Sequence, residues 1–313
     1  MTVSETTTPT STSPSTPAPR WNVGENRRPA DGFHPHSQEA ERSESSQRSQ
    51  EPSPRLRADA VSLAYDERMV VDGVTLDVPT GKITVVVGPN GCGKSTLLRG
   101  LGRLLKPRGG SVLLDGEVIT ELPTREVARR LGLLPQQPIV PEGVSVLEPV
   151  ERGRHPHHGL FRSWGRADEE AVASALTRTD LVELASVPVD SLSGGQRQRV
   201  WLAMVLAQDT PVLLLDEPTS FLDIAHQLDV LDLVRSLRDQ SGTTVVMVLH
   251  DLAMAARYAD HLVAMSDGRI IAEGPPAQVV TPEVIADVFG VTASVIVDPE
   301  SGTPVVMPRR RAS

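Results

Sequence analysis

The sequence predicts an α/β fold built around a mainly parallel β-sheet, and two observations lead to this prediction. Three continuous apolar stretches have the length of strands: "ITVVVG", "PVLLLD" and "TTVVMVLH". Such runs are typical of strands that are buried on both faces of a sheet. Segments with helical periodicity alternate with them, at Lys94 to Leu105 and Leu222 to Leu237. Strands that alternate with helices form βαβ units, in which neighbouring strands run parallel.

Antiparallel strands are expected on both sides of this core. Before it, "LRADAVSLAY" and "RMVVDGVTLDV" alternate apolar and polar residues as strands do. After the first core strand and its helix, "GSVLLDGEVI" predicts a hairpin because Asp115-Gly116 suits a tight turn. Near the end of the chain, "HLVAMSDGRIIAEG" predicts a hairpin that turns at Asp267-Gly268, and "SVIVDPESGTPVVMP" predicts another.

The pattern also divides the chain into regions. Between Pro138 and Gln208 helical periodicity dominates, as in "DEEAVASALTRTDLVELA", which predicts a helical subdomain at about 138–208 inserted in the α/β domain. Residues 1–55 are rich in Ser, Thr, Pro, Glu and Arg and have few apolar anchors. We therefore expect a disordered tail over 1–55, a folded domain over 56–308 and a short C-terminal tail over 309–313.

Composition and charge exclude several classes of protein. The 313 residues are 39% hydrophobic and 23% charged, an ordinary globular balance. A net charge of −9 argues against nucleic-acid binding, which relies on a basic face. The longest apolar run, Val200 to Ala207, is far shorter than the ~20 residues that span a bilayer, and the N-terminus lacks a signal-peptide pattern. A soluble cytoplasmic protein is expected, and its single cysteine excludes an internal disulfide framework and a cysteine cluster for zinc.

A phosphate-binding loop is the strongest motif. "ITVVVGPNGCGKST" matches G-x-x-x-x-G-K-[ST] between a predicted strand and a predicted helix, which is the context that this motif requires. The glycines let backbone N–H groups surround a β-phosphate, Lys94 brings charge to the β- and γ-oxygens, and Ser95 offers a hydroxyl to Mg²⁺. Cys92 occupies a variable position, either as filler or with a redox role. The predicted loop comprises Gly88, Pro89, Asn90, Gly91, Cys92, Gly93, Lys94, Ser95 and Thr96.

Three further side chains follow buried strands. The strand "VLLLDEPTS" ends in Asp216, which can bind the water shell of Mg²⁺, and in Glu217, which can act as base toward the water that attacks a γ-phosphate. His250 closes "VVMVLH", and a third parallel strand that ends beside the phosphates predicts a γ-phosphate contact. Acids or a lone histidine at strand ends are often structural, but the phosphate-binding loop in the same chain favours a functional role.

A second glycine-rich turn lies in "SLSGGQRQRVWLAMV", which contains no acid and no histidine. Ser193 can cap a helix whose N-terminal amides, left bare by Gly194 and Gly195, point at a γ-phosphate. A helix cap alone explains Ser193 but not the glycine pair. The phosphate loop at Gly88 to Thr96 already provides one phosphate site. This second glycine-rich turn is therefore either redundant or serves another nucleotide.

Together, these motifs resemble the ATP-binding subunit of an ABC transporter. The resemblance rests on "LSGGQ", the phosphate loop, "LLLDEP", a glutamine in "LLPQQP" and the histidine of "LHD", and it covers roughly Leu56 to Pro308. It implies an ATPase that uses Mg²⁺, in which two subunits sandwich two ATP molecules head to tail. The turn formed by Ser193, Gly194, Gly195 and Gln196 then serves the ATP held by the other subunit.

The same resemblance implies roles for three more residues. Tyr65 in "LAYDER" stacks on adenine, although a strand tyrosine is often a packing residue. Gln136 links Mg²⁺ and water to the membrane partner, with Gln137 beside it as the alternative. Asp223 in "SFLD" reaches across the interface between the two subunits of the dimer. The implied catalytic residues are thus Glu217, His250 and Gln136, and the implied metal site is Ser95, Gln136 and Asp216.

Longer stretches such as "RGRHPHHGLFRSW" and "VLHDLAMAARYADHLVAM" resemble the ATPases of ferric-siderophore importers of the ferric-enterobactin type. The implied partners are a second subunit, expected to be identical, an integral-membrane permease and, indirectly, a substrate-binding protein, with the chain at the cytoplasmic face of the membrane. The substrate rests on resemblance alone, because this subunit does not touch the transported compound.

Several alternatives stay open. Haem or cobalamin are other substrates of relatives, and a stand-alone ABC ATPase such as an iron–sulfur assembly factor is another class. An ABC ATPase of DNA repair would need a coiled-coil insert or a second cassette, while a kinase or GTPase with a phosphate loop leaves "LSGGQ" unexplained. "RHPHHG" offers three imidazoles for a metal, but Pro156 breaks a regular geometry, which favours a surface loop near the membrane partner.

Overall fold

A computed structural model describes residues 54–136, 143–158, 164–220 and 222–311 of the chain. The predicted N-terminal tail lies outside these residues except for its last two, and so does Gln137. Within the described part, no helix is long and apolar enough to cross a membrane.

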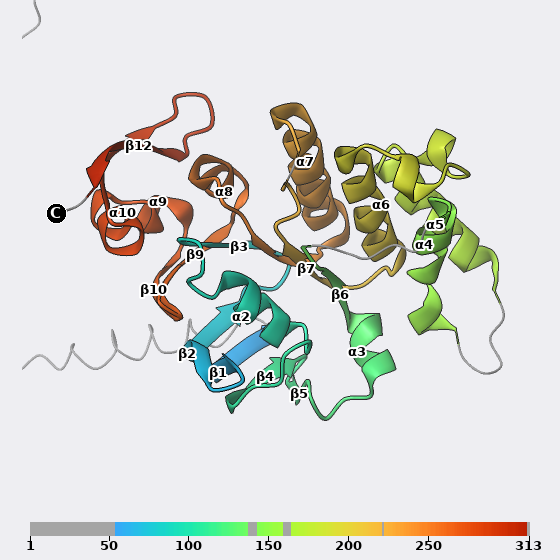
Figure 1. Cartoon of the computed structure of the whole chain (residues 1–313), viewed down its shortest axis with the longest axis horizontal. Helices are drawn as coiled ribbons and strands as arrows, with labels where there is room; N and C mark the ends of the chain where they lie inside the picture. The colour runs from blue at the N-terminus through green and yellow to red at the C-terminus, as the bar shows by residue number, and fades with distance from the viewer. Residues whose placement is uncertain (1–53, 137–142, 159–163, 221, 312–313) are drawn as a thin grey trace, which may run out of the picture. The chain divides into compact units, whose positions relative to one another are not determined.

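A six-stranded sheet forms the centre of the fold, with the strand order β10-β9-β3-β8-β7-β6 (Figure 1). Strands β6, β7, β8, β3 and β9 run parallel to one another. Only the edge strand β10 runs antiparallel to its neighbour β9. Every residue of β3, β7 and β8 is buried, which confirms the α/β prediction from continuous apolar runs. The strands are β3 (Ile83–Val87), β6 (Leu131–Leu134), β7 (Val212–Asp216), β8 (Thr244–Val248), β9 (His261–Ser266) and β10 (Arg269–Gly274).

A second sheet packs with helix α2 (Lys94–Leu101) on one face of the central sheet (Figure 1). It is antiparallel, with the order β2-β1-β4-β5. Its strands are β1 (Leu56–Tyr65), β2 (Arg68–Val78), β4 (Gly109–Leu114) and β5 (Glu117–Val118). Side chains alternate across the central sheet, so that Val86, Leu214 and Val246 point into this layer. Helix α2 ends earlier than the expected Leu105, since Gly102 follows it and Arg103 has a φ of 61°.

Helices cover the other face of the central sheet. Val85, Leu213 and Met247, the alternate residues of the same strands, point toward them. The helices of this layer are α6 (Gly194–Ala207), α7 (Ile224–Ser241), α8 (Leu252–Tyr258), α9 (Pro276–Val279) and α10 (Pro282–Phe289).

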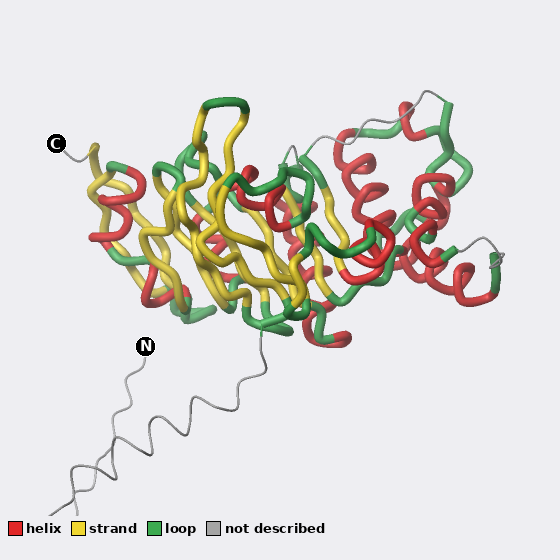
Figure 2. Tube along the Cα trace, turned by 90° about the horizontal axis from the view of Figure 1, so that it is seen from below, coloured by secondary structure: helices red, strands yellow, loops and turns green. Residues whose placement is uncertain are grey.

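A helical region with its own apolar cluster confirms the predicted insertion. It contains α4 (Leu147–Arg152), α5 (Arg166–Arg178), the start of α6 and 3-10 turns at His155–His157, Val182–Leu184 and Val189–Ser191. Figure 2 shows these helices in red beyond the yellow strands, at the end where Figure 1 labels α4, α5 and α6. A short helix, α3 (Thr124–Arg130), leads into β6. Neither α3 nor β6 is expected from the sequence.

The C-terminal hairpin consists of β11 (Val291–Val297) and β12 (Pro304–Arg311). The predicted end of the folded domain at 308 is wrong, because β12 continues to Arg311. Arg310 pairs with Thr292, and Arg311 pairs with Val291. Pairing with β11 therefore extends β12 through residues that the sequence predicts as a C-terminal tail.

Candidate functional site: a nucleotide-binding cleft

The predicted site residues follow the carboxyl ends of neighbouring parallel strands. The phosphate loop follows β3, Asp216 ends β7, and Glu217 comes next. Gln136 lies two residues after β6, and His250 lies two residues after β8. In open α/β sheets, ligands bind at this edge.

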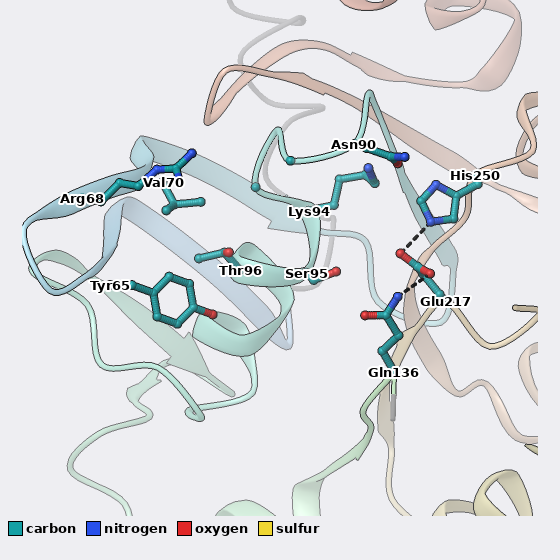
Figure 3. Close-up of a pocket in the computed structure, with 12 residues that line it drawn as sticks. Tyr65, Arg68, Val70, Asn90, Lys94, Ser95, Thr96, Gln136, Glu217 and His250 are labelled. Carbon is teal, nitrogen blue, oxygen red and sulfur yellow. Dashed lines mark hydrogen bonds and ion pairs between the residues drawn. The ribbon is translucent and has the colours of Figure 1, made fainter. Parts of the chain in front are cut away.

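The loops enclose a cavity of about 620 Å³ (Figure 3). Tyr65 stands at one end of it, and Glu217, His250 and Gln136 converge at the other, with Lys94 and Ser95 between them. Its lining residues are Tyr65, Arg68, Val70, Asn90, Gly91, Gly93, Lys94, Ser95, Thr96, Gln136, Glu217 and His250.

The phosphate loop has a backbone that requires glycine. A Cβ on Gly88 would lie 2.2 Å from the carbonyl oxygen of Met265, and Gly93 has a φ of 107° where it begins α2. Lys94 is buried, and its Nζ donates to the carbonyl oxygens of Gly88 and Pro89, both at 2.9 Å. Since an ammonium group has three N–H donors, one remains to bind an anion in the cavity.

Ser95 and Asp216 supply oxygen atoms suited to a hard cation. The Ser95 hydroxyl donates to Oδ1 of Asp216 at 2.8 Å, and Asp216 is only 2% exposed. Burial raises the pKa of the Asp216 carboxyl, which the Ser95 hydrogen bond opposes. Mg²⁺ is commonly held by one or two protein oxygen groups together with substrate phosphates and water. The residues present therefore fit a magnesium ion beside the phosphate loop.

Three side chains hold the carboxylate of Glu217. Its Oε1 lies 2.6 Å from Nε2 of His250, and its Oε2 accepts hydrogen bonds from Gln136 at 2.7 Å and Ser220 at 2.9 Å. Burial raises the pKa of this carboxyl, but the hydrogen bonds from His250, Ser220 and Gln136 outweigh it, so that the pKa lies below its ordinary value. The group is therefore ionised at neutral pH and aimed into the cavity (Figure 3).

Tyr65 lies at the end of the cavity away from Glu217 (Figure 3). It is 40% exposed rather than packed in the core, and its hydroxyl accepts a hydrogen bond from Nη1 of Arg99 at 3.0 Å. Arg68 pairs with Tyr65 across the β1–β2 turn and lines the same end. The sequence analysis missed Arg68, Arg99 and Ser220. Only the nearness of Arg68 to Tyr65 in the predicted hairpin could have indicated one of them.

The second glycine-rich turn is not part of this cavity. None of the described residues that line the cavity belongs to Ser193–Gln196. Ser193 begins α6 with a capping box, in which its Oγ accepts from the Gln196 N–H at 3.2 Å and its own N–H donates to Gln196 Oε1 at 3.0 Å. Gly194 is exposed. Asp223 likewise caps α7 by accepting from the His226 N–H at 3.0 Å, outside the cavity.

The histidines of "RHPHHG" bind separate partners. His157 Nε2 lies 2.7 Å from the carbonyl oxygen of Gln208, and His158 Nε2 lies 3.2 Å from Oδ2 of Asp168. Across the described ranges, no group of three or more His, Cys, Asp or Glu residues could hold a metal ion.

Comparisons with known proteins agree with this geometry. Residues 71–220 match the family model described as ABC transporter. The chain is 50% identical to the ferric enterobactin transport ATP-binding protein FepC of Escherichia coli (strain K12), over 83% of this chain and 96% of that protein. It is 45% identical to the hemin import ATP-binding protein HmuV of Rhodococcus jostii (strain RHA1), over 82% of this chain and 86% of that protein.

The fold also matches a solved structure. The dimeric structure of MJ0796, a bacterial ABC transporter cassette, superimposes with a TM-score of 0.63 and 29% sequence identity, covering 70% of this chain and 98% of that chain. Both the sequence and the fold thus match ATP-binding subunits of ABC transporters. The chain belongs to the ABC transporter family, as an ATP-binding subunit that hydrolyses ATP to drive transport.

Proposed function

We propose that this chain energises the import of a ferric siderophore across the cytoplasmic membrane. The ATPase part is supported by one observation above all: the Glu217 carboxylate is held by three donors at the mouth of the phosphate-loop cavity. The substrate class is supported by the 50% identity to the E. coli protein named for ferric enterobactin transport.

The shape of the cavity suits ATP. Tyr65 stacks on the adenine at one end, and the loop amides with Lys94 hold the phosphates between Tyr65 and Glu217. Ser95 and Asp216 hold Mg²⁺, with Gln136 contributing to its water shell. When bound, this ion neutralises charge on the β- and γ-phosphate oxygens.

Glu217 orients the attacking water. Its ionised carboxylate accepts a hydrogen bond from the water and can take up a proton as the γ-phosphate is attacked. His250 lines the cavity beside Glu217, and when both of its ring nitrogens carry a proton, one N–H can hold the carboxylate while the other donates to a γ-phosphate oxygen. Gln136 binds the same carboxylate and lies just before the residues that lead to the helical region. It therefore suits the proposed link to a membrane partner.

The exposed turn at Ser193 acts on the ATP of a second subunit. It lies outside the cavity of its own chain, and its capped helix end leaves N–H groups directed outward. A head-to-tail homodimer places these groups on the partner's γ-phosphate, with Asp223 at the dimer contact. The dimer works beneath an integral-membrane permease at the cytoplasmic face, and a substrate-binding protein delivers the ferric compound to that permease.

Uptake of radiolabelled ferric siderophores tests the substrate class. A strain that lacks this gene should lose uptake under iron limitation, the parental gene should restore it, and a Glu217→Gln gene should not. Uptake that persists without the gene would contradict the siderophore assignment.

Haem is the second candidate substrate, because the Rhodococcus relative named for hemin import is 45% identical. Growth of the same strains on haem as the sole iron source separates the two. Loss of growth on haem with normal siderophore uptake would favour haem instead.

A further inference from the structure

The loop that carries Glu217 is attached to the first turns of α6. The side-chain amide of Gln198 donates from Nε2 to the carbonyl oxygen of Pro218 at 3.1 Å. Closer to the start of α6, a Cβ on Gly195 would lie 3.2 Å from Cδ2 of Leu222, so the end of the loop packs tightly against the helix. Leu222 itself is buried in the core beneath the helices. Two contacts thus join the start of α6 to both ends of the loop.

Glu217 needs such support because its backbone is strained. Its φ is 53°, a region that non-glycine residues seldom adopt, and a proline follows it. Strained residues of this kind persist only where their surroundings hold them in place. Ser220 closes the loop by donating from its N–H to the Glu217 carbonyl oxygen at 3.1 Å. Gln198 adds a hydrogen bond from another element, which it donates to the Pro218 carbonyl oxygen.

The same helix end carries the exposed turn at Ser193. The capping box joins Ser193 to Gln196 by two hydrogen bonds at this end of α6, and Gln198 follows within the next turn of the same helix. Any displacement of the turn is therefore passed to Gln198 and through it to the peptide that follows Glu217. Under the proposed function, the turn contacts ATP bound by the partner subunit, whereas Glu217 serves the ATP of its own chain.

We propose that Gln198 is a positioning residue that couples the two ATP sites of the dimer. When the turn at Ser193 engages ATP on the partner, Gln198 holds the Pro218 carbonyl and sets the Glu217 carboxylate for its own site. The inference rests on the proposed action of this turn across the dimer.

Replacing Gln198 by Leu tests the coupling, because leucine keeps the bulk and removes the amide donor. We expect kcat of the full-length protein to fall about 3- to 10-fold, the range of a lost neutral hydrogen bond. KM for ATP should stay close to the parental value, since the phosphate loop is unchanged. The Hill coefficient for ATP should fall toward one. Gln198→Glu also lacks the amide donor and should behave in the same way. It replaces Gln198→Leu in these assays if the leucine variant folds poorly.

Gln208→Leu is the matched control. Gln208 caps the other end of α6, and its Nε2 donates to the carbonyl oxygens of Ala128 at 2.6 Å and Leu131 at 3.1 Å. It joins the same helix to the core far from the Glu217 loop. This variant should lower Tm but leave kcat and the Hill coefficient unchanged.

The outcomes separate the inference from the proposed function. Parental kcat and Hill coefficient in both Gln198 variants would overturn the coupling while the ATPase assignment stands. Equal losses of kcat in Gln198→Leu and Gln208→Leu would also overturn it, because they would indicate a general effect of helix stability. A parent that shows no ATP hydrolysis would overturn both.

Discussion

At the scale of single residues, the proposed reaction depends on where the Glu217 carboxylate is held. Glu217 has its side chain bound by His250, Gln136 and Ser220, and these three come from different loops. Their hydrogen bonds lower the pKa of the carboxyl, against the effect of burial. A base held in this way remains ionised at neutral pH and does not have to be oriented during the reaction.

Glu217→Gln should therefore keep ATP binding and lose turnover. The amide has the same shape, but it cannot accept the proton of the attacking water. Removing a general base typically costs about 10²- to 10⁴-fold in rate. Steady-state ATPase assays measure the loss, and size exclusion with ATP should show an accumulated dimer. Glu300→Gln, at an exposed acid on the C-terminal hairpin, is the control and should hydrolyse normally. A Glu217→Gln protein with the parental rate would remove this residue from the mechanism.

Cys92 should react slowly with thiol reagents in the folded protein. Its side chain is 5% exposed, and burial raises the pKa of the thiol above the ordinary 9.0. A raised pKa means less thiolate than a free cysteine has at any pH below that value, and the thiolate is the reactive form. Mass spectrometry after iodoacetamide treatment at pH 8 should show much slower alkylation than in guanidinium-unfolded protein. Equal rates would contradict the buried thiol and support a redox role for it.

At the scale of elements, α6 and the segments around it connect the helical region to the central sheet. The apolar run from Val200 to Ala207 is buried on both sides, because Trp201, Leu202 and Val205 pack on the core of the α/β domain while Ala203 packs in the helical region. Arg154 joins the end of this helix to α5. It donates to the Ala207 carbonyl oxygen at 2.7 Å and to Asp168 Oδ1 at 3.0 Å.

Arg154→Met should destabilise the helical region strongly. Arg154 is 4% exposed and Asp168 is fully buried, so the substitution removes the arginine partner of a buried carboxylate. Breaking a buried ion pair typically lowers the free energy of unfolding by about 3–5 kcal/mol. Urea unfolding followed by circular dichroism measures this, and Arg154→Met combined with Asp168→Leu should recover part of the loss. A double variant no more stable than the single one would contradict the ion pair as the cause.

The same pair predicts a pH dependence. Burial raises the pKa of Asp168, but Arg154, the Gly165 N–H and His158 outweigh it and hold it below the ordinary 3.8. A depressed acid pKa stabilises the folded state above the ordinary value, and this contribution is lost as pH falls through the lower pKa of the folded state. Unfolding free energy measured from pH 5 downward should decrease less steeply in the double variant than in the parent. Equal slopes would contradict the assignment to Asp168.

At the scale of the whole molecule, the proposed function gives one chain two halves of different ATP sites. The cavity beside the phosphate loop is lined by Lys94, Glu217 and His250, and the turn at Ser193 is not among its described lining residues. Under this proposal a complete site requires two chains, so damage to the two halves should complement between chains.

Mixed dimers test this directly. One chain carries Gly194→Asp, which the structure accommodates because nothing lies within 4 Å of the added Cβ, and the other carries Lys94→Ala. With Glu217→Gln in both chains to slow hydrolysis, each variant alone should fail to trap radiolabelled ATP. After mixing, one composite site is intact, so trapping should return to as much as one ATP per dimer. No gain on mixing, while both variants still fold and dimerise with the parent, would refute action across the dimer.

The sequence alone determined the features that depend on local pattern. Continuous apolar runs identified β3, β7 and β8, and the residues immediately after them carried the phosphate loop, the two acids and the histidine. The strand predictions are confirmed because a buried strand leaves a continuous apolar run in adjacent residues, and the start of a helix likewise depends on adjacent residues. The order of the motifs along the chain then indicated the family.

Only the tertiary structure decided which distant residues meet. Strand β6 has four residues, too few for periodicity to be recognised, yet it brings Gln136 to Glu217, which is 81 residues away in the sequence. Strand β9 lies beside β3 in the central sheet and runs parallel to it, and no local sequence pattern specifies that neighbour. The contact of Gln198 with Pro218 likewise depends on how α6 lies across the sheet. Strand order and helix placement follow from how separate apolar surfaces pack together, and that free energy belongs to the assembled core rather than to any one segment.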